Sequence, residues 1–362
     1  TDGTCTANIT NNLSNRNKLI NGENLVSQRG TSETGVASTK YANAPDRWQF
    51  YAYPSSESGT FTVSQDSEAP NGFQKSYKVD CTTADTSLQA DSGVILRQTI
   101  EEQNLQDFRK GFSDAKQFSL SFYVKTTKTG TYVCELYDMR NTRHVSATYT
   151  VSDTNWNRYT ITFPADTTGA FNKASNSGGM IVHWWLVAGT NYTSGSLGTT
   201  WGNTAANRAV GQLNFADSTS NDFYLTGCQL EVGSVATDFE HRSFGQELAL
   251  CQRYYYRETI NNAEYFRGLG KADSDGNSID LNIDFPVPMR ATPSAVEQTG
   301  DGNNYLIRGS STLQCTGVPT YGDATPVQAQ VRFTRSSHGI STNNVANCGS
   351  WGGSYLGFST EL

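Results

Sequence analysis

The chain has 362 residues, of which 36% are hydrophobic, 11% aromatic and 17% charged, and its net charge is −7. The aromatic content excludes an intrinsically disordered chain, and an acidic balance without a basic run argues against a nucleic-acid-binding protein. The low charge and the 33 glycines are typical of a turn-rich, all-β protein that is secreted or lies on the surface of a particle. At about 150 residues per domain, the length predicts two or three domains.

Residues 1–16 are polar and carry no periodicity, so we expect an N-terminal arm or linker. From 17 to 240, short runs of alternating apolar and polar residues are separated by turn clusters. In one such run, Phe118, Leu120 and Phe122 alternate with Ser119 and Ser121. Strands at this spacing, with few helical patterns between them, predict a two-sheet sandwich or a barrel over residues 17–240.

One predicted strand, 180–187, is apolar on both of its faces. One face would carry Met180, Val182, Trp184 and Leu186, and the other Ile181, His183, Trp185 and Val187. Such a strand is either buried on both sides or has one side covered by a ligand or a partner. The complete apolar run, 180–189, is too short to cross a bilayer, so we expect no membrane insertion.

A long polar segment, 188–222, contains Tyr192 and Trp201. A loop of this length is usually functional or held by a partner. Aromatic rings pack on the C–H face of a sugar while amides bond its hydroxyls. We therefore predict a carbohydrate site whose rings come from Trp201, Tyr192 and Trp185 and whose hydrogen bonds come from Asn191, Asn203 and Gln212. The alternative is that the aromatic residues pack in the core, which we expect for Trp48, Trp156 and Trp184.

A helical pattern interrupts the strands between 243 and 257, inside a predicted connecting segment 241–258. Ser243 and Gln246 form a capping box at its start. The apolar positions step by four, three and four residues through Phe244, Leu248, Cys251 and Tyr255. This stripe predicts a helix that packs on one of its neighbouring domains or, alternatively, a trimer interface on a symmetry axis.

Strand patterns resume from 259 to 362 and predict a second, smaller β domain. Residues 279–285 and 327–333 alternate strictly between apolar and polar side chains. The seven cysteines form no C-x-x-C pair, which disfavours a zinc site. A disulfide between Cys315 and Cys348 is one pairing that this domain allows.

No catalytic motif is present. The sequence contains no G-x-S-x-G, H-E-x-x-H, Walker or G-x-G-x-x-G pattern, and its four histidines lie far apart. We therefore expect a protein that is not an enzyme and that needs no cofactor.

Several segments resemble carbohydrate-binding-module-like jelly rolls. They are LINGE at 19–23, DRW at 46–48, SYKV at 76–79, FSLSFYVK at 118–125 and WNRYTITF at 156–163. The closing segment FYLTGCQLEVGSVAT at 223–237, continued to 255, resembles bacteriophage tail-fibre and related virion surface proteins. FPVPMRATP at 285–293 and LGFSTEL at 356–362 are similar to the small β domain that ends such proteins.

This resemblance covers residues 17–362 and implies a two-sheet jelly-roll sandwich on the surface of a phage virion, often in homotrimers. In related modules a structural calcium lies between the first and last strands, and Glu23 and Asp222 match its ligands here. The usual tandem acidic pair is replaced by Asn221 and Asp222, which offers one carboxylate.

The implied function is non-catalytic binding of a host cell-surface glycan, with other virion proteins as further partners. One alternative is a structural capsid-decoration or fibre protein that has no receptor role. Another is a glycan-degrading spike, which would need two carboxylates facing each other across a groove.

Overall fold

The structure is a computed structural model that describes residues 15–54, 58–260, 264–274, 276–342 and 344–362. The chain forms two compact units, a first unit that ends at Glu247 and takes in Leu362, and a second unit from Leu248 to Glu361. The division falls inside the predicted connecting segment 241–258. Most of the predicted arm 1–16 lies outside the described residues. None of the helices in the described ranges has the length and the apolar character that a membrane crossing requires.

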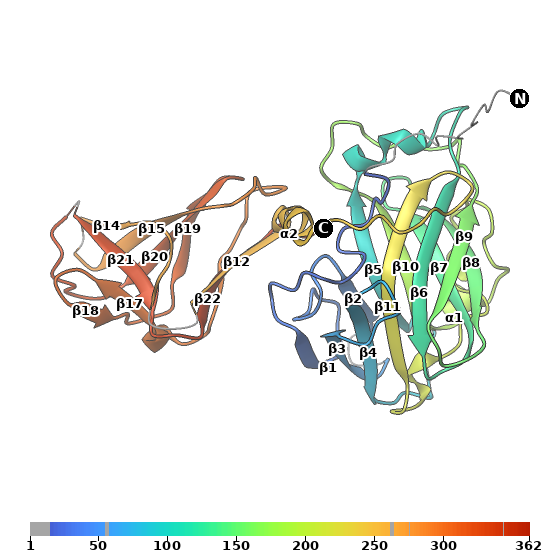
Figure 1. Ribbon diagram of the computed structural model, residues 1–362, viewed down its shortest axis with the longest axis horizontal. Helices are drawn as coiled ribbons and strands as arrows, with labels where there is room; N and C mark the ends of the chain where they lie inside the picture. Colours follow the sequence, from blue (N-terminus) through green and yellow to red (C-terminus); the bar gives the residue numbers. More distant parts are fainter. Residues whose placement is uncertain (1–14, 55–57, 261–263, 275, 343) are drawn as a thin grey trace, which may run out of the picture. The chain divides into compact units, whose positions relative to one another are not determined.

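The first unit is a sandwich of two antiparallel sheets (Figure 1). The six-stranded sheet has the order β1 (Ser32–Val36), β3 (Thr60–Asp66), β4 (Ser76–Thr83), β11 (Asp222–Val232), β6 (Phe118–Thr126) and β9 (Asn157–Phe163). The five-stranded sheet has the order β2 (Gln49–Tyr53), β5 (Gly93–Glu101), β10 (Gly178–Ala188), β7 (Gly130–Asp138) and β8 (Arg143–Val151). Strands far apart in sequence are neighbours in both sheets. This arrangement confirms the predicted all-β, two-sheet jelly roll.

The main core lies between these two sheets, because alternate residues of each strand point inward. Trp48 and Trp184 are both buried and meet edge to face at 5.4 Å, as expected of core residues. The same prediction is wrong for Trp156, which is only partly buried. Its indole N–H donates to the exposed carboxylate of Glu68 at 3.0 Å, so this ring lies on the surface.

The second apolar face of β10 is covered by the chain itself. Residues 189–213 fold back over the five-stranded sheet through the short helices α1 (Thr190–Thr193) and η2 (Ala205–Asn207). Trp185 packs there in a small second core with Ala209 and Tyr192. The backbone of Arg208 accepts a 2.7 Å hydrogen bond from Ser146 of β8, which fixes the segment on the sheet. The strand is therefore buried on both sides within one chain.

The second unit is a smaller β domain, which confirms that part of the predicted fold class. One sheet has the order β12 (Tyr255–Ile260), β22 (Ser354–Ser359) and β16 (Glu297–Gln298). The other has the order β18 (Thr312–Gln314), β17 (Tyr305–Arg308), β21 (Val345–Ser350), β14 (Gly270–Ala272), β15 (Ser278–Asp284), β20 (Gln328–Thr334) and β19 (Thr320–Ala324), and β13 (Glu264–Tyr265) also pairs with β21. Cys315 and Cys348 are buried free thiols, so the proposed disulfide is wrong. Both fill apolar space in this core.

Few helices interrupt the strands. They are η1 (Glu102–Phe108), η3 (Phe215–Asp217), η4 (Gly302–Asn304) and α2 (Phe244–Gln252), besides α1 and η2. The capping box at the start of α2 is confirmed, because the amide and hydroxyl of Ser243 both donate to Gln246 Oε1 at 3.0 Å. The unit boundary lies within this helix, between Glu247 and Leu248.

Candidate functional site

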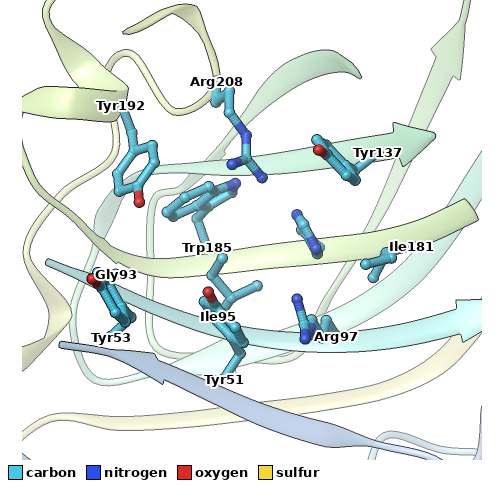
Figure 2. A pocket seen from close by; sticks show the side chains of 11 residues that line it. Tyr51, Tyr53, Gly93, Ile95, Arg97, Tyr137, Ile181, Trp185, Tyr192 and Arg208 are labelled. Atoms are coloured by element: carbon cyan, nitrogen blue, oxygen red, sulfur yellow. The ribbon is translucent and has the colours of Figure 1, made fainter. Parts of the chain in front are cut away.

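A pocket of about 180 Å³ lies on the outer face of the five-stranded sheet. It is lined by Tyr51, Tyr53, Gly93, Ile95, Arg97, Tyr137, Ile181, His183, Trp185, Tyr192 and Arg208. Figure 2 shows Tyr51, Tyr53 and Arg97 on one side of it and Tyr192, Arg208 and Tyr137 on the other. Sites that enclose a drug-sized molecule occupy roughly 300–1,000 Å³, so this volume suits a single ring-sized group.

The period of two along each strand builds this lining. Side chains two residues apart on a strand point to the same face, so Tyr51 and Tyr53 of β2 line the pocket together. Strand pairing then sets the order across the sheet, because Arg97 of β5 lies opposite His183 of β10. The segment that covers β10 supplies Tyr192 and Arg208.

A buried carboxylate lies beneath the pocket. Glu135 of β7 is fully buried and accepts hydrogen bonds from His183 Nδ1 at 2.7 Å and from Trp185 Nε1 at 3.0 Å. It also accepts two from Arg208, at 2.6 Å from Nε and 3.0 Å from Nη2. Burial opposes the ionisation of Glu135, but Arg208 and His183 outweigh it and lower the pKa of Glu135 to about 2. This carboxylate holds three pocket side chains in fixed positions.

His183 presents an unused acceptor to the pocket. Burial lowers the pKa of His183 to about 4, against the opposing effect of Glu135, so the ring is neutral at neutral pH. Because ionised Glu135 only accepts, the ring proton lies on Nδ1 and the lone pair on Nε2. Nε2 is buried and has no hydrogen-bond partner among the described residues. A donor on a bound molecule would satisfy it.

Two guanidinium groups flank this histidine. Arg208 lies over the rings of Tyr137 and Tyr192, at 4.9 and 5.5 Å from their centres. Arg97 lies 4.0 Å from the ring centre of Tyr51, and its Nε donates to Gln49 Oε1 at 2.6 Å. These contacts orient both guanidinium planes within the pocket.

The structure brings together two of the six predicted carbohydrate-site residues. Tyr192 and Trp185 both line the pocket, and their ring centres are 5.2 Å apart. Trp185 is only 1% exposed, so its ring forms a floor covered by Tyr192 and Arg208 instead of an open platform. The accessible aromatic surface comes instead from β2, where Tyr53 is 48% exposed.

The other four predicted residues lie outside this lining. Trp201 packs against the main core, 6.0 Å from the ring of Phe118, and its indole N–H donates to the carbonyl of Pro164 at 2.8 Å. The amide of Gln212 bonds three backbone groups, on Val133, Leu186 and Leu213. Asn191 and Asn203 are exposed on the covering segment.

The two predicted calcium ligands do not form a shared site. Glu23 Oε1 is hydrogen-bonded to His241 Nδ1 at 2.8 Å. Asp222 instead forms a 3.0 Å ion pair with Lys78. Within the described residues, no cluster of three or more potential ligands is present. These residues therefore do not fit the structural calcium that the resemblance implies.

The predicted trimer stripe is divided between exposed and buried positions. Phe244 is 57% exposed and Leu248 is partly buried. Cys251 and Tyr255 are buried within the single chain, and the hydroxyl of Tyr255 donates to Glu297 at 2.9 Å. Phe244 thus offers the most accessible apolar surface of the stripe.

Similar structures include carbohydrate-binding modules and a phage tailspike domain. The enzymatically active domain of bacteriophage CBA120 tailspike protein 4 is 11% identical with a TM-score of 0.31, over 60% of this chain and 21% of that one. The family 11 carbohydrate-binding module from Clostridium thermocellum, solved with a mixed-linked tetrasaccharide, is 11% identical with a TM-score of 0.27. The match covers 59% of this chain and 99% of that one. The CBM22-1 xylan-binding domain from Paenibacillus barcinonensis Xyn10C is 11% identical with a TM-score of 0.27. The match covers 58% of this chain and 100% of that one.

No protein-family model matches the chain, and no curated protein matches its sequence.

Proposed function

We propose that the first unit is a glycan-binding module that holds a sugar ring in the pocket on the outer face of the five-stranded sheet. The observation that carries this proposal is a ring-sized pocket with tyrosine walls and fixed polar groups at its floor. Tyrosine rings pack on the C–H face of a pyranose, and their hydroxyl groups remain available for hydrogen bonds. His183 Nε2 and the two guanidinium groups add an acceptor and several donors.

The preformed geometry supports binding. Glu135 fixes Arg208, His183 and Trp185 before any ligand arrives, so little side-chain ordering is needed on association. The affinity of one ring-sized site is expected to be weak.

We further propose that binding is non-catalytic. None of the residues that line the pocket is Asp or Glu, whereas glycoside hydrolysis generally uses a pair of carboxylates about 5–9.5 Å apart. Glu135 lies below the lining, with four hydrogen bonds and a lowered pKa, so it is a poor proton donor.

The biological setting that we propose is the surface of a phage virion, with the chain as a fibre or receptor-binding component in a homotrimer. The support is the resemblance of residues 223–255 to tail-fibre proteins, together with exposed Phe244 at the start of α2. Three copies would raise the avidity of weak sites. Sedimentation analysis of the purified chain tests the trimer, and a monomer at micromolar concentration would contradict it.

The binding proposal is tested on a broad glycan array, followed by calorimetry with the best ligand. Tyr53→Ala removes an exposed wall and should weaken binding by about 1–3 kcal/mol, by analogy with aromatic stacking on other planar ligands. Trp351→Ala is the matched control, because Trp351 is 50% exposed but lies in the second unit.

A second variant fills the pocket without removing any of its contacts. A Cβ built on Gly93 would lie 3.5 Å from the Trp185 ring and 3.9 Å from that of Tyr192, which is ordinary contact distance. The γ-methyl groups of Gly93→Val would extend beyond this Cβ and occupy the space between the two rings, so the variant should lose binding. Circular dichroism shows whether it is folded. If the folded protein binds no glycan, or if Gly93→Val and Tyr53→Ala both bind as the wild type does, the proposal is wrong, and a structural role on the virion becomes the better explanation.

A further inference from the structure

One cation in the pocket has no charged partner among the described residues. Arg208 is neutralised by Glu135 through two hydrogen bonds. Arg97 is partly buried, yet in the described part of the chain it has no ion pair, and its Nε donates a hydrogen bond to neutral Gln49. Burial is the main cause that lowers the pKa of Arg97, and nearby Arg208 lowers it further. An unpaired, partly desolvated charge is costly, and an anionic ligand would compensate it.

The orientation of Arg97 selects the shape of that anion. Its Nε is already bonded to Gln49, and its plane is held 4.0 Å from the ring centre of Tyr51. Its two Nη groups, at the outer end of the guanidinium, therefore remain available to a ligand. Two parallel N–H groups match the two oxygens of a carboxylate.

His183, the residue beside Arg97, offers an acceptor for a hydrogen-bond donor on the ligand. Arg97 and His183 are direct cross-strand partners on β5 and β10, so their side chains leave the same face of the sheet about 5 Å apart at Cβ. His183 Nε2 is a buried acceptor without a partner in the described residues. A hydroxyl next to a carboxylate would satisfy both groups at once.

We propose that the pocket is selective for a sugar that bears a carboxylate, with Arg97 pairing with the carboxylate and His183 Nε2 accepting a hydrogen bond from a neighbouring hydroxyl. A hexuronic acid has this combination, since its carboxylate and ring hydroxyls project from adjacent carbons. The inference rests on the proposed glycan-binding function and names the class of sugar that the same site takes.

The test compares matched ligands by calorimetry or ligand-observed NMR on the full chain. The ligands are a hexuronic acid oligosaccharide, its methyl ester, the corresponding neutral hexose oligosaccharide and a sulfated hexose oligosaccharide. We expect the acid to bind at least about tenfold more tightly than the ester and the neutral sugar, which is the value of one charge-assisted hydrogen bond. Its affinity should fall with added salt more steeply than that of the neutral sugar.

A pair of variants assigns the selectivity to Arg97. Arg97→Gln should remove the preference for the acid over its ester, and the ratio of the two affinities measures this loss. Arg158→Gln is the matched control, because Arg158 is an exposed residue of β9 in the other sheet. Circular dichroism shows whether each variant is folded.

The outcomes separate this inference from the function on which it rests. If neutral sugars bind in the pocket and Gly93→Val blocks them, but the acid has no advantage, glycan binding stands and the carboxylate selectivity is overturned. Sulfated sugar binding as tightly as the uronic acid also overturns it. If no sugar of any kind binds, both proposals fail.

Discussion

The buried carboxylate Glu135 allows the sharpest test of how the pocket is held. Glu135→Gln keeps the size of the side chain and removes its charge. The amide has one acceptor oxygen, whereas the carboxylate accepts four hydrogen bonds, from His183, Trp185 and twice from Arg208. At least one donor then loses its partner, and the guanidinium of Arg208 loses its only counter-charge in the described residues.

Removing one partner of a buried ion pair costs about 3–5 kcal/mol, because the other charge stays buried and uncompensated. We expect Glu135→Gln to lower the free energy of unfolding of the first unit by that amount. Urea unfolding followed by tryptophan fluorescence measures it. Five of the six tryptophans, 48, 156, 184, 185 and 201, lie in the first unit, so the signal reports mainly on that unit.

Glu68→Gln is the matched control, since it makes the same chemical change at an exposed ion pair with Lys125. Exposed pairs contribute at most about 1 kcal/mol. If Glu135→Gln costs no more than Glu68→Gln, the buried network does not hold the pocket together and the reasoning is refuted.

Four further outcomes are expected. Trp201→Ala should lower stability by about 2–3 kcal/mol in thermal or urea unfolding and leave glycan affinity unchanged, because the ring packs on the main core; a selective loss of binding would contradict this placement. The free energy of unfolding should decrease as the pH falls below 6.5. The pKa of His183 is lowered from 6.5 to about 4 and that of Glu135 from 4.5 to about 2. Below pH 6.5 the unfolded chain therefore binds protons that the folded chain does not. His183→Gln should flatten the upper part of this dependence, between pH 6.5 and 4, by on the order of 1–3 kcal/mol, and an unchanged slope would argue against it. Alanine at Asn203 should leave glycan affinity within about twofold, since this exposed amide does not line the pocket.

The strands could be predicted from the sequence because their signal is local. Alternation around Phe118 and along 180–187 sets which side chains share a face, and the structure follows it. The capping box at Ser243 is equally local, and its hydrogen bonds form as expected. Local patterns do not contain the order of strands in a sheet.

The site depends on the order of strands in the sheet, which local patterns do not contain. Arg97, Glu135 and His183 come from three strands, and only the pairing of β5, β10 and β7 makes them neighbours. The alternation of β7 places Glu135 on the outer face, which suggests contact with water. The segment 189–213 buries it instead, and no sequence pattern showed that this segment folds back. Tyr51 and Tyr53, two residues apart in the aromatic run 48–53, were the one local signal that could have led to the pocket wall.

The placement of Trp201 shows the same limit. Its neighbours are glycine and threonine, which favour an exposed loop, yet the ring lies against Phe118 and bonds Pro164. Composition describes the chain near a residue, whereas burial depends on which distant segment covers it. The pairing of Cys315 with Cys348 failed for a related reason, because nearness in a small domain does not by itself make a bond.

The segment 189–213 gives the pocket two walls of different origin. One is part of the sandwich, where a substitution in a strand also disturbs the packing between the sheets. The other belongs to a surface excursion of the chain, which is anchored by Arg208, Trp201 and Gln212. Changes in length and sequence are best tolerated between these anchors. The wall formed by Tyr192 and Arg208 can therefore diversify while the Arg97 side of the pocket, which belongs to the scaffold, stays constant.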